Sequence, residues 1–535
     1  MDQRAREVHT SLWWGRRGRP AEPWEAPDRG PLPSTGEVHD VVVVGAGLTG
    51  LTTAVLLARG GVRPLVLEGR YAGSGTTGHS TAKLSVLQGS IYSGIRSHFG
   101  DDAVRAYGQA QRAGQGWLLA FCATAGVPVQ HRDAWTYAVT GKGAKKVAAE
   151  RRACAAAGLA VEETSATELP FDVRSAIRMP EQAQFDPVEV VAALRAELES
   201  LGGTVLEGVQ VTGVSIGSGD GDAREPATLR TRRGDVLGRR VVLATGMPVL
   251  DRGLYFAKLK PERSYALAYR VPEGDGPLPQ GMYLSVDSPS RSLRTAPGGA
   301  GGGAGAGGAG ADGEELLVVG GNGHVVGRRG SPREAVADLD AWTRASFPGS
   351  ELVFSWAAQD YETANQVPFV GVMPRSNGQL FLATGFHKWG MTNAAAAGLM
   401  LSADLLGEGA AQDIGWARPL RHRMTSPRDL ANGIEFNGTV GLRMARDWAA
   451  RAIPFGRRDT PAEGEGFVER GSMPPTGVCT VAGVTHRVDA VCPHLAGILS
   501  WNDSDLSWDC PLHGSRFTAD GHRIEGPALR NLDQR

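Results

Sequence analysis

Two pairs of metal-ligating side chains lie in the last fifty residues of the sequence. One pair is Cys492 and His494, in Cys-Pro-His, and the other is Cys510 and His513, in Cys-Pro-Leu-His-Gly. Each pair joins a soft thiolate to an imidazole, which suits a [2Fe–2S] cluster in which two Cys hold one iron and two His hold the other. Zinc fingers usually group Cys with Cys and His with His, so zinc is the weaker alternative. The spacing therefore predicts an iron–sulfur site.

A run of glycines near the N-terminus predicts a dinucleotide-binding turn. Residues 40–51 place Gly45, Gly47 and Gly50 in the pattern G-x-G-x-x-G, after a Val-rich strand and before an apolar helix. The first glycine permits a tight turn, the second lets the backbone approach a pyrophosphate, and the third lets helix and strand pack closely. Glu68 ends the next predicted strand, where a carboxylate can accept both ribose hydroxyls. The residues expected at this site are Gly45, Ala46, Gly47, Leu48, Thr49, Gly50, Glu68, Gly69 and Arg70.

The glycine pattern by itself fits both NAD and FAD, and a second glycine-rich segment raises the question of a second nucleotide. Residues 316–327 also look like a strand that enters a glycine turn, which would suit NADPH. No helix pattern follows directly, because residues 328–332 read Arg-Arg-Gly-Ser-Pro. We interpret this segment as the end of a strand in the substrate domain, with nucleotide binding as the alternative.

Alternating strand and helix patterns position the glycine turn. Strands are predicted at residues 41–44, 64–67 and 204–214, and helices at 48–59, 188–201, 332–346 and 392–405. The alternation up to about residue 250 indicates an α/β fold with a largely parallel sheet, and a more strand-rich region follows over residues 265–327.

Changes in composition divide the chain into four parts. Residues 1–38, rich in Pro, Arg and Trp, are expected to form an extended arm, and residues 39–408 a large domain. Residues 409–459 read as a helical or irregular linker, and residues 460–535 as a small all-β domain. The Gly/Ala tract at 297–313 has no side chains that could offset its ordering entropy, so it is expected to be a disordered loop between two strands.

Six ordered segments of the large domain resemble the FAD-dependent oxidoreductases of the D-amino-acid-oxidase-like superfamily. They are residues 76–83, 185–187 with 207–211, 241–246, 356–361, 368–371 and 382–392. The resemblance implies a Rossmann-type FAD-binding domain with an interleaved α+β substrate domain. It also implies that Val211 contacts the adenine through its backbone, that Thr245 and Gly246 line the adenosine half, and that the 76–83 loop passes beside the flavin. The cofactor contacts expected in that loop are Thr77, Gly78, His79, Ser80, Thr81 and Lys83.

The start of the Ala-rich helix at 392–405 is expected to face the flavin ring. Glycines break the chain just before it, so free N–H groups at the helix N-terminus can face an anion. Reduced flavin carries negative charge at N1 and O2, which this helix end would stabilise. The residues expected there are Gly385, Lys388, Gly390, Met391 and Thr392.

The C-terminal segment resembles a Rieske domain over residues 460–535. Rieske proteins of respiratory complexes carry an extra Cys after each ligand pair, and here Leu512 and residues 496–497 stand in those places. The missing disulfide suggests a reduction potential toward the low end of the Rieske range, nearer roughly −150 than +300 mV. We interpret Cys479 as a core thiol rather than a ligand.

A flavin domain joined to a Rieske domain suggests an oxidoreductase that takes a hydride from the carbon beside a nitrogen, in an amine or amino acid. Single electrons would then pass to an electron-transfer protein or a quinone. Arg294 is a candidate partner for a substrate carboxylate, and Tyr265 and Tyr361 are candidate donors in the pocket. The alternatives are electron entry through the cluster from an external reductase, and a redox sensor without turnover.

The composition limits which partners and which cellular compartment we expect for this protein. The chain has 56 Lys and Arg against 57 Asp and Glu, so its net charge of -1 gives no reason to expect binding to nucleic acid. Five cysteines in 535 residues do not form a disulfide scaffold. The N-terminal residues lack the apolar region of a signal peptide, and the most apolar window is interrupted by glycines. We expect a cytoplasmic protein without a membrane span.

Overall fold

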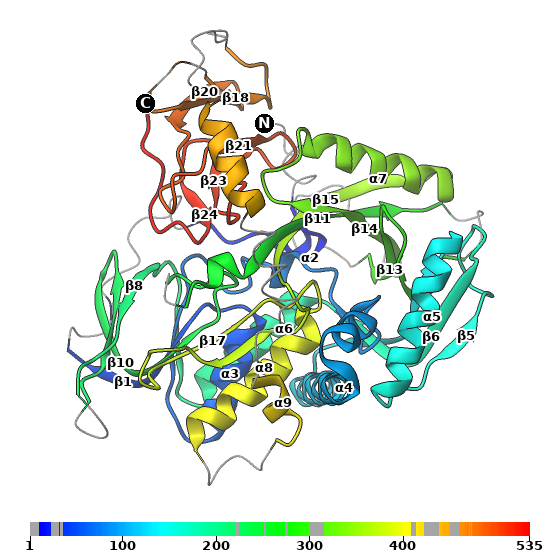
Figure 1. Cartoon of the computed structure of the whole chain (residues 1–535), viewed down its shortest axis with the longest axis horizontal. Coiled ribbons are helices and arrows are strands. Elements are labelled where there is room, and N and C mark those ends of the chain that lie inside the picture. Colours follow the sequence, from blue (N-terminus) through cyan, green and yellow to red (C-terminus); the bar gives the residue numbers. More distant parts are fainter. Residues whose placement is uncertain are drawn as a thin grey trace.

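The computed structural model shows a large body with two extended sheets and a small C-terminal domain beside it (Figure 1). It describes residues 10–22, 32, 36–219, 224–250, 253–272, 277–298, 315–407, 414–421, 438–449, 460–469, 471 and 473–535. Most of the Gly/Ala tract predicted to be disordered, and much of the predicted linker, lie outside these residues.

The first sheet has β1 (Val38–Val44) at its centre and carries the glycine turn. Its main order is β16-β17-β10-β1-β2-β7, in which β1 is parallel to both β2 (Leu65–Leu67) and β10 (Gly234–Leu243). Residues 41–44 are all buried, as expected for a strand covered on both faces. The remaining strands are β7 (Thr204–Leu206), β8 (Val211–Ser215), β9 (Ala227–Thr231), β16 (Phe369–Val372) and β17 (Leu380–Thr384).

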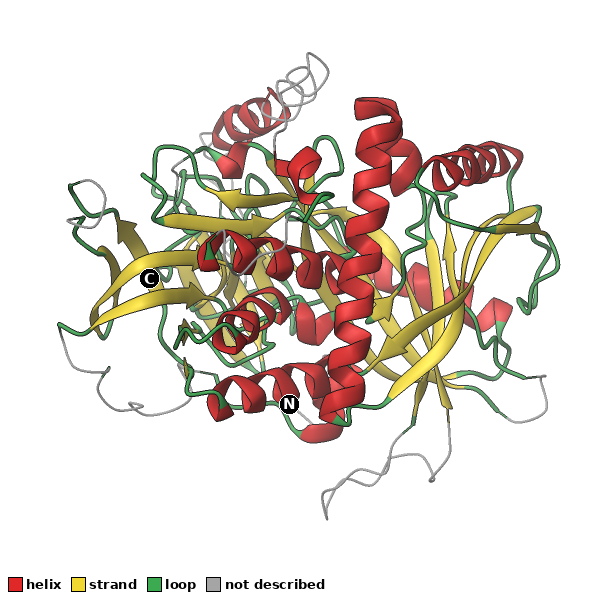
Figure 2. Ribbon diagram, turned by 90° about the horizontal axis from the view of Figure 1, so that it is seen from below, coloured by secondary structure: helices red, strands yellow, loops and turns green. Residues whose placement is uncertain are grey.

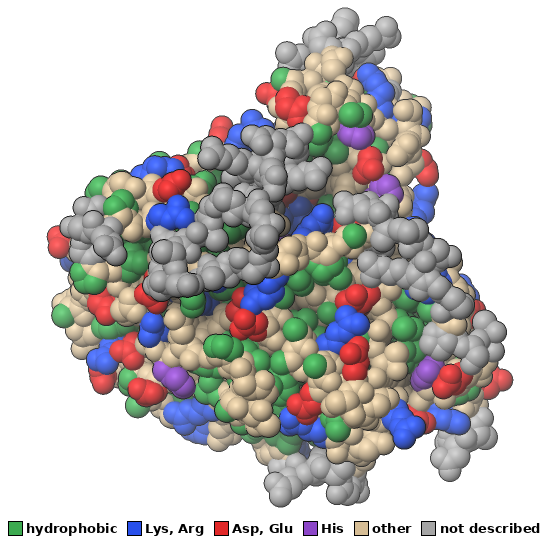
Figure 3. Space-filling view, turned by 180° about the vertical axis from the view of Figure 1, so that it is seen from behind, with side chains coloured by type: hydrophobic (Ala, Val, Ile, Leu, Met, Phe, Trp, Pro, Cys, Tyr) green, Lys and Arg blue, Asp and Glu red, His purple; other side chains and the backbone are tan. Residues whose placement is uncertain are grey.

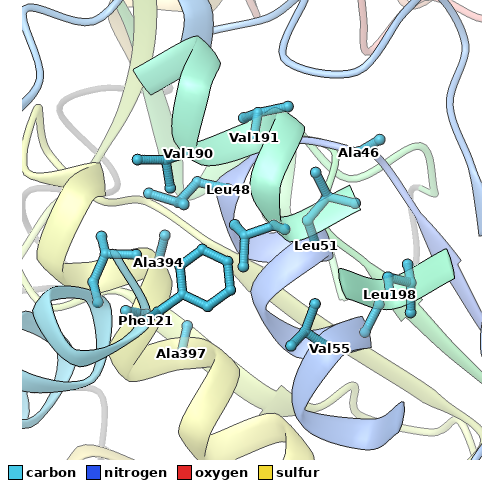
Figure 4. Packing of buried hydrophobic residues seen from close by; sticks show 14 of the residues in the cluster. Ala46, Leu48, Leu51, Val55, Phe121, Val190, Val191, Leu198, Ala394 and Ala397 are labelled. Carbon is cyan, nitrogen blue, oxygen red and sulfur yellow. The ribbon is translucent and has the colours of Figure 1, made fainter. Parts of the chain in front are cut away.

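Helices cover this sheet through a continuous apolar core. Figure 4 shows α3 (Leu48–Arg59) packed against α6 (Pro187–Ser200) and α8 (Gly390–Leu406). Phe121 reaches the same core from α4 (Ile91–Ala125), the long helix that stands between the two large sheets in Figure 2. This packing holds the N-termini of α3 and α8 at the same edge of the sheet, where the cleft described below opens.

The second sheet forms the other half of the large domain. Its order is β15-β11-β14-β13-β12-β4-β6-β3, and α5 (Gly141–Ala156) and α7 (Pro332–Ser346) pack on it. Its strands are β3 (Lys83–Leu84), β4 (Val129–Ala138), β5 (Glu162–Thr164), β6 (Ser175–Phe185), β11 (Leu259–Arg270), β12 (Met282–Ser285), β13 (Arg291–Pro297), β14 (Glu315–Val325) and β15 (Glu351–Thr363). Residues 316–327 therefore supply β14 of this sheet, in agreement with our interpretation of the second glycine-rich segment.

The C-terminal domain is built of two small antiparallel sheets around Trp508 and Phe517, which are both 0% exposed. One sheet contains β18 (Gly466–Val468), β19 (Thr476–Val481) and β20 (Val484–Asp489). The other contains β21 (Ser500–Asn502), β22 (Ser507–Asp509), β23 (Arg516–Thr518) and β24 (Arg523–Glu525). The all-β character predicted for this part of the chain is confirmed.

Two predicted elements differ from the structure. The strand predicted at 204–214 is two strands, β7 and β8, because Gly208 adopts a φ of +68° between them. The N-terminal arm is not simply extended: Leu12–Arg17 forms the short helix α2, which buries Trp13 and Trp14. Ser11 begins this helix and its hydroxyl accepts a hydrogen bond from the backbone N–H of Trp14.

Among the described residues, none of the helices has both the length and the apolarity to cross a bilayer.

Candidate functional site: a nucleotide cleft and a cysteine–histidine centre

The turn between β1 and α3 leaves no room for side chains. Gly45 has a φ of +106°, and a Cβ there would lie 2.5 Å from the carbonyl oxygen of Ala244. A Cβ on Gly50 would overlap the carbonyl oxygen of Gly45, so helix and strand meet backbone to backbone. Gly47 caps α3 without a side chain, which leaves the helix N-terminus accessible to a phosphate.

A long cleft opens above this turn and gathers most of the predicted cofactor contacts. The predicted residues that line it are Gly45, Gly47, Leu48, Thr49, Glu68, Gly69, Arg70, Thr77, Ser80, Val211, Thr245, Gly246, Gly385, Lys388, Gly390 and Met391. Ala46, Gly50, Gly78, His79, Thr81, Lys83 and Thr392 belong to the same segments but do not line the cleft. The elements therefore assemble as a dinucleotide site requires, with two helix N-termini at one edge of a parallel sheet.

Glu68 lines the cleft at the end of β2, where we expect the adenosine half of the cofactor. Its carboxylate accepts hydrogen bonds from the backbone N–H groups of Ala46 and Arg70, each at 2.8 Å. Burial raises the pKa of Glu68, while these two N–H groups and the nearby Arg70 guanidinium act in the opposite direction. Arg70 itself pairs with Glu22 of the N-terminal arm. The carboxylate is thus held at the end of β2, where ribose hydroxyls would meet it.

The N-terminal arm supports residues 76–83, the loop expected beside the flavin and called the flavin loop below. Ser11 Oγ donates to the carbonyl oxygen of Gly78 at 2.7 Å, and Trp13 Nε1 donates to that of Ser80 at 2.7 Å. Trp356 Nε1 donates to the carbonyl oxygen of His79 at 2.8 Å. The sequence did not predict this support, since residues 11–14 lie more than sixty positions from the loop.

The loop before α8 has an unusual backbone that brings polar groups to the cleft. Gly385, His387 and Lys388 have φ values of +80°, +50° and +68°. The backbone N–H of Lys388 donates to the carboxylate of Asp360, which also lines the cleft. Burial raises the pKa of Asp360 to about 6. Lys388 Nζ lies 3.0 Å from Glu262 on β11, so the wall of the cleft nearest α8 is polar and charged.

The three candidate substrate residues have different positions. Tyr361 lines the cleft, and its hydroxyl accepts a hydrogen bond from Gln359 Nε2 at 3.0 Å. Tyr265 does not line it; it is 2% exposed, with its hydroxyl 2.9 Å from His324 Nε2.

Arg294 does not reach the cleft, and its surroundings explain why. It is 1% exposed and stacks on Trp13, with its guanidinium carbon 5.4 Å from the ring centre. Its Nε donates to the carbonyl oxygen of Thr295 at 2.9 Å, and its Nη1 donates to those of Thr81 and Ala82. These donors fasten the flavin loop to β13, so Arg294 is a structural support and not a substrate contact.

The second site consists of two loops that bring the predicted metal ligands together. Cys492 begins the first turn, in which its backbone N–H donates to the carbonyl oxygen of Gly497 at 2.8 Å. Cys510 begins the second, in which its backbone N–H donates to the carbonyl oxygen of Ser515 at 2.8 Å. A Cβ on Gly497 would lie 3.1 Å from the Sγ of Cys510, so the two loops are in close contact. The two thiols lie close enough to interact, which lowers the pKa of Cys492, while this interaction and burial raise the pKa of Cys510.

The imidazoles of this site also lie side by side. The ring centres of His494 and His513 are 5.2 Å apart, with the planes at 84°. No three His, Cys, Asp or Glu side chains in the described part of the chain converge as ligands of one ion. A [2Fe–2S] cluster needs only two protein ligands on each iron, so paired sulfurs beside paired imidazoles fit it.

The imidazole side of this centre faces the flavin domain. The ring of Phe256, from the short helix between β10 and β11, lies 5.3 Å from the ring of His494 and 5.0 Å from that of His513. Gln359 Nε2 donates to the carbonyl oxygen of Gly514 at 2.8 Å, and Arg328 Nε donates to that of Pro511 at 2.9 Å. The metal-binding loops are therefore held against the body that carries the nucleotide cleft.

The C-terminal domain also reaches the cleft itself. Residues 523–526, which form β24 and the glycine after it, line the cleft together with Glu68 and Gly69. No feature of the sequence predicted this, because the two segments are about 450 positions apart and only the docking of the domains joins them.

Comparisons with known families agree with both sites. Residues 40–403 match the model of the FAD dependent oxidoreductase family, DAO, and residues 470–534 match that of the Rieske [2Fe-2S] domain. The Bacillus subtilis protein named as a Rieske 2Fe-2S iron-sulfur protein, YhfW, is 29% identical over 498 residues, which cover 92% of this chain and 93% of YhfW.

Solved structures share the fold of the large domain. L-proline dehydrogenase from P. horikoshii has a TM-score of 0.54 at 17% identity and covers 69% of this chain and 93% of its own. Glycine oxidase from Geobacillus kaustophilus has a TM-score of 0.54 at 21% identity, over 69% of this chain and 94% of its own. With both family models matched and both sites assembled, the chain belongs to the FAD-dependent oxidoreductases and joins to them a Rieske domain, with FAD and a [2Fe–2S] cluster as its cofactors.

Proposed function

We propose that this protein oxidises the carbon–nitrogen bond of an amine or amino acid by hydride transfer to FAD. The electrons would then leave one at a time through the Rieske cluster to an electron-transfer protein or a quinone. When bound, FAD supplies a two-electron acceptor and the cluster a one-electron carrier. The observation that carries the proposal is the contact of Phe256 with both His494 and His513, which joins the imidazole side of the centre to the flavin domain.

The polar wall of the cleft supports a small polar substrate. Lys388, Glu262 and Asp360 lie together where the cleft meets the start of α8. Hydride loss from an amine demands little acid–base chemistry from the protein, since the neutral amine must chiefly be held against the flavin. The names of the two structural neighbours, a glycine oxidase and an L-proline dehydrogenase, support an amino-acid-like substrate by analogy of fold alone.

An anaerobic titration of the full-length protein tests the proposal. Amino acids and amines are added in turn while flavin absorbance and the EPR signal of the cluster are followed together. We expect one substrate class to bleach the flavin first and then to raise the EPR signal of the reduced cluster. The proposal fails if no amine reduces either centre while an external reductase or NAD(P)H reduces the cluster and then the flavin, because electrons then flow inward.

A substitution between the two sites separates electron transfer from substrate oxidation. Phe256→Leu removes the ring that contacts both imidazoles but keeps an apolar side chain in its place. We expect the rate of flavin reduction to stay as in the wild type, and the rate of cluster reduction that follows it to fall. Equal rates for both steps in the two proteins would show that electrons do not pass by way of this contact.

A further inference from the structure

We infer that the Rieske domain completes the FAD site, and that Arg523 of this domain binds the adenosine half of FAD. The inference uses FAD as the cofactor but is independent of the substrate and of the direction of electron flow. It assigns to the Rieske domain a second role, the retention of a cofactor held by another domain.

Arg523 lies at the adenosine end of the cleft. It begins β24 and lines the cleft with Glu68, Gly69 and Gln210. Its Nη2 is 3.7 Å from the point where a Cβ on Gly69 would lie. Glu68 ends β2, the position from which a carboxylate meets the ribose in dinucleotide folds. The guanidinium thus reaches the ribose end of the cleft from the opposite domain.

The Rieske domain holds Arg523 in this place. The backbone N–H of Arg523 donates to Asn531 Oδ1 at 3.1 Å, and its Nη1 donates to the carbonyl oxygen of Ala528 at 3.3 Å. Next to it, Gln210 Nε2 of the flavin domain donates to the carbonyl oxygen of Leu529 at 3.0 Å. The two domains are therefore hydrogen-bonded directly beside the side chain.

Arg523 has donor capacity that the protein does not use. Its Nη2, the atom that approaches Gly69, makes no hydrogen bond among the described residues, and its Nε, which is buried, has no partner either. Glu68 and Glu525 are the carboxylates near it, but Glu68 accepts two backbone N–H groups and Glu525 pairs with Arg516 at 3.3 Å. Burial lowers the pKa of Arg523 to about 10, with the neighbouring Arg70 and Arg232 acting in the same direction, so the side chain is still charged at neutral pH. Arg523 is a half-buried cation, and its unused Nη2 donor can bind an acceptor in the cleft that it lines.

The adenosine half of FAD supplies that acceptor. Ribose hydroxyls and adenine nitrogens accept hydrogen bonds, and a guanidinium plane also stacks on an aromatic base. FAD bound here would touch both domains, so its dissociation would require the Rieske domain to move away. The docked Rieske domain should accordingly slow the loss of FAD.

Binding of FAD to the full-length apoprotein, prepared with its cluster intact, tests the inference. Arg523→Ala should weaken the binding of FAD and of ADP by roughly 10-fold or more, the loss expected for a hydrogen bond to a charged group. Riboflavin lacks the adenosine half, so its affinity should not change. Arg523→Lys should recover part of the FAD affinity. The matched control is Arg530→Ala, an exposed arginine of the same domain that pairs with Asp533 at 3.5 Å, and it should behave as the wild type.

Cluster absorbance and EPR show whether each variant is folded. Arg523→Gln, which keeps an uncharged polar side chain at this position, serves if the Ala variant loses its cluster. Wild-type affinity for FAD and ADP in a folded Ala or Gln variant would overturn the inference. An equal loss of affinity for FAD and riboflavin would also overturn it, because the effect would then not belong to the adenosine half.

Discussion

The C-terminal domain contains two buried cysteines with different predicted roles: Cys510 as a cluster ligand and Cys479 as a core thiol. Cys510 and Cys479 are 2% and 0% exposed, but Cys510 faces Cys492, whereas the Cys479 thiol lies 3.6 Å from the carbonyl oxygen of Ala519. We expect Cys510→Ser to abolish the Rieske EPR signal and the bound iron while FAD is retained. Cys479→Ser should keep both cofactors, and iron analysis with EPR measures the difference. A Rieske signal in the Cys510 variant would contradict the ligand assignment.

The buried carboxyl group of Glu150 is expected to make the free energy of unfolding depend on pH. It is 0% exposed on α5, and its oxygens accept the backbone N–H groups of Tyr92 and Ser93 at 3.0 and 2.8 Å, in the first turn of α4. Burial raises its pKa from 4.5 to about 7.

A carboxyl whose pKa is raised on folding favours the native state below its unfolded pKa and loses that contribution as pH rises through the folded pKa. Between about pH 4.5 and 7 the wild type should therefore lose roughly 3 kcal/mol of unfolding free energy from Glu150. Glu150→Gln should lack this loss, because an amide does not titrate. Chemical unfolding at several pH values measures the slope, and parallel slopes for the two proteins would contradict the assignment.

At the scale of elements, the loop between β22 and β23 meets β11 and β15 at a glycine. Gly514 has a φ of +80°, and a Cβ there would lie 2.5 Å from Pro261 Cβ and 2.9 Å from Gln359 Nε2. Gly514→Ala should lower the free energy of unfolding by about 1 kcal/mol because of the backbone conformation. The overlap of the new Cβ should lower it by a further roughly 1–3 kcal/mol. Gly483→Ala is the matched control, since its φ is +75° and no atom lies within 4 Å.

In the control, Gly483→Ala, the free energy of unfolding should fall only by the backbone contribution of about 1 kcal/mol. Unfolding followed by cluster absorbance compares the two variants. Equal losses would show that the close contact between the domains at Gly514 does not contribute to stability.

At the scale of the whole molecule, one buried ion pair fastens the two domains. Arg263 on β11 is 4% exposed, and its Nε lies 2.5 Å from Asp505 of the Rieske domain. Asp505 also lies 3.4 Å from Arg516 within its own domain. On the face that Figure 3 shows, acidic and basic side chains are interspersed.

Arg263→Ala should weaken the docking by roughly 1–3 kcal/mol, because the Asp505 carboxylate, 15% exposed, loses one of its two arginine partners. Calorimetry should then resolve two unfolding transitions where the wild type has one, and FAD should dissociate faster. Arg333→Ala is the control: this exposed arginine also contacts the Rieske domain, through the carbonyl oxygens of Gly464 and Asp503 at 3.3 and 3.2 Å. Identical behaviour of the two variants would show that the buried pair does not govern docking.

Features that depend on a few neighbouring residues can be read directly from the sequence. The turn after β1 needs glycine at positions 45 and 50 for steric reasons, and α3 occupies residues 48–59 as predicted because its apolar periodicity is local. The four ligands of the cluster were predicted from spacing in the same way, and the matching family models support the two cofactors.

Contacts between side chains that are far apart in the sequence could be found only from the folded structure. Arg294 supports the flavin loop because Trp13 and the carbonyls of Thr81 and Ala82 surround it, and none of these is near it in sequence. Phe256 and Arg523 had no distinguishing pattern, since their roles arise where two domains dock. Local steric and periodic constraints are readable from the chain, whereas contacts between distant segments depend on how the whole core packs.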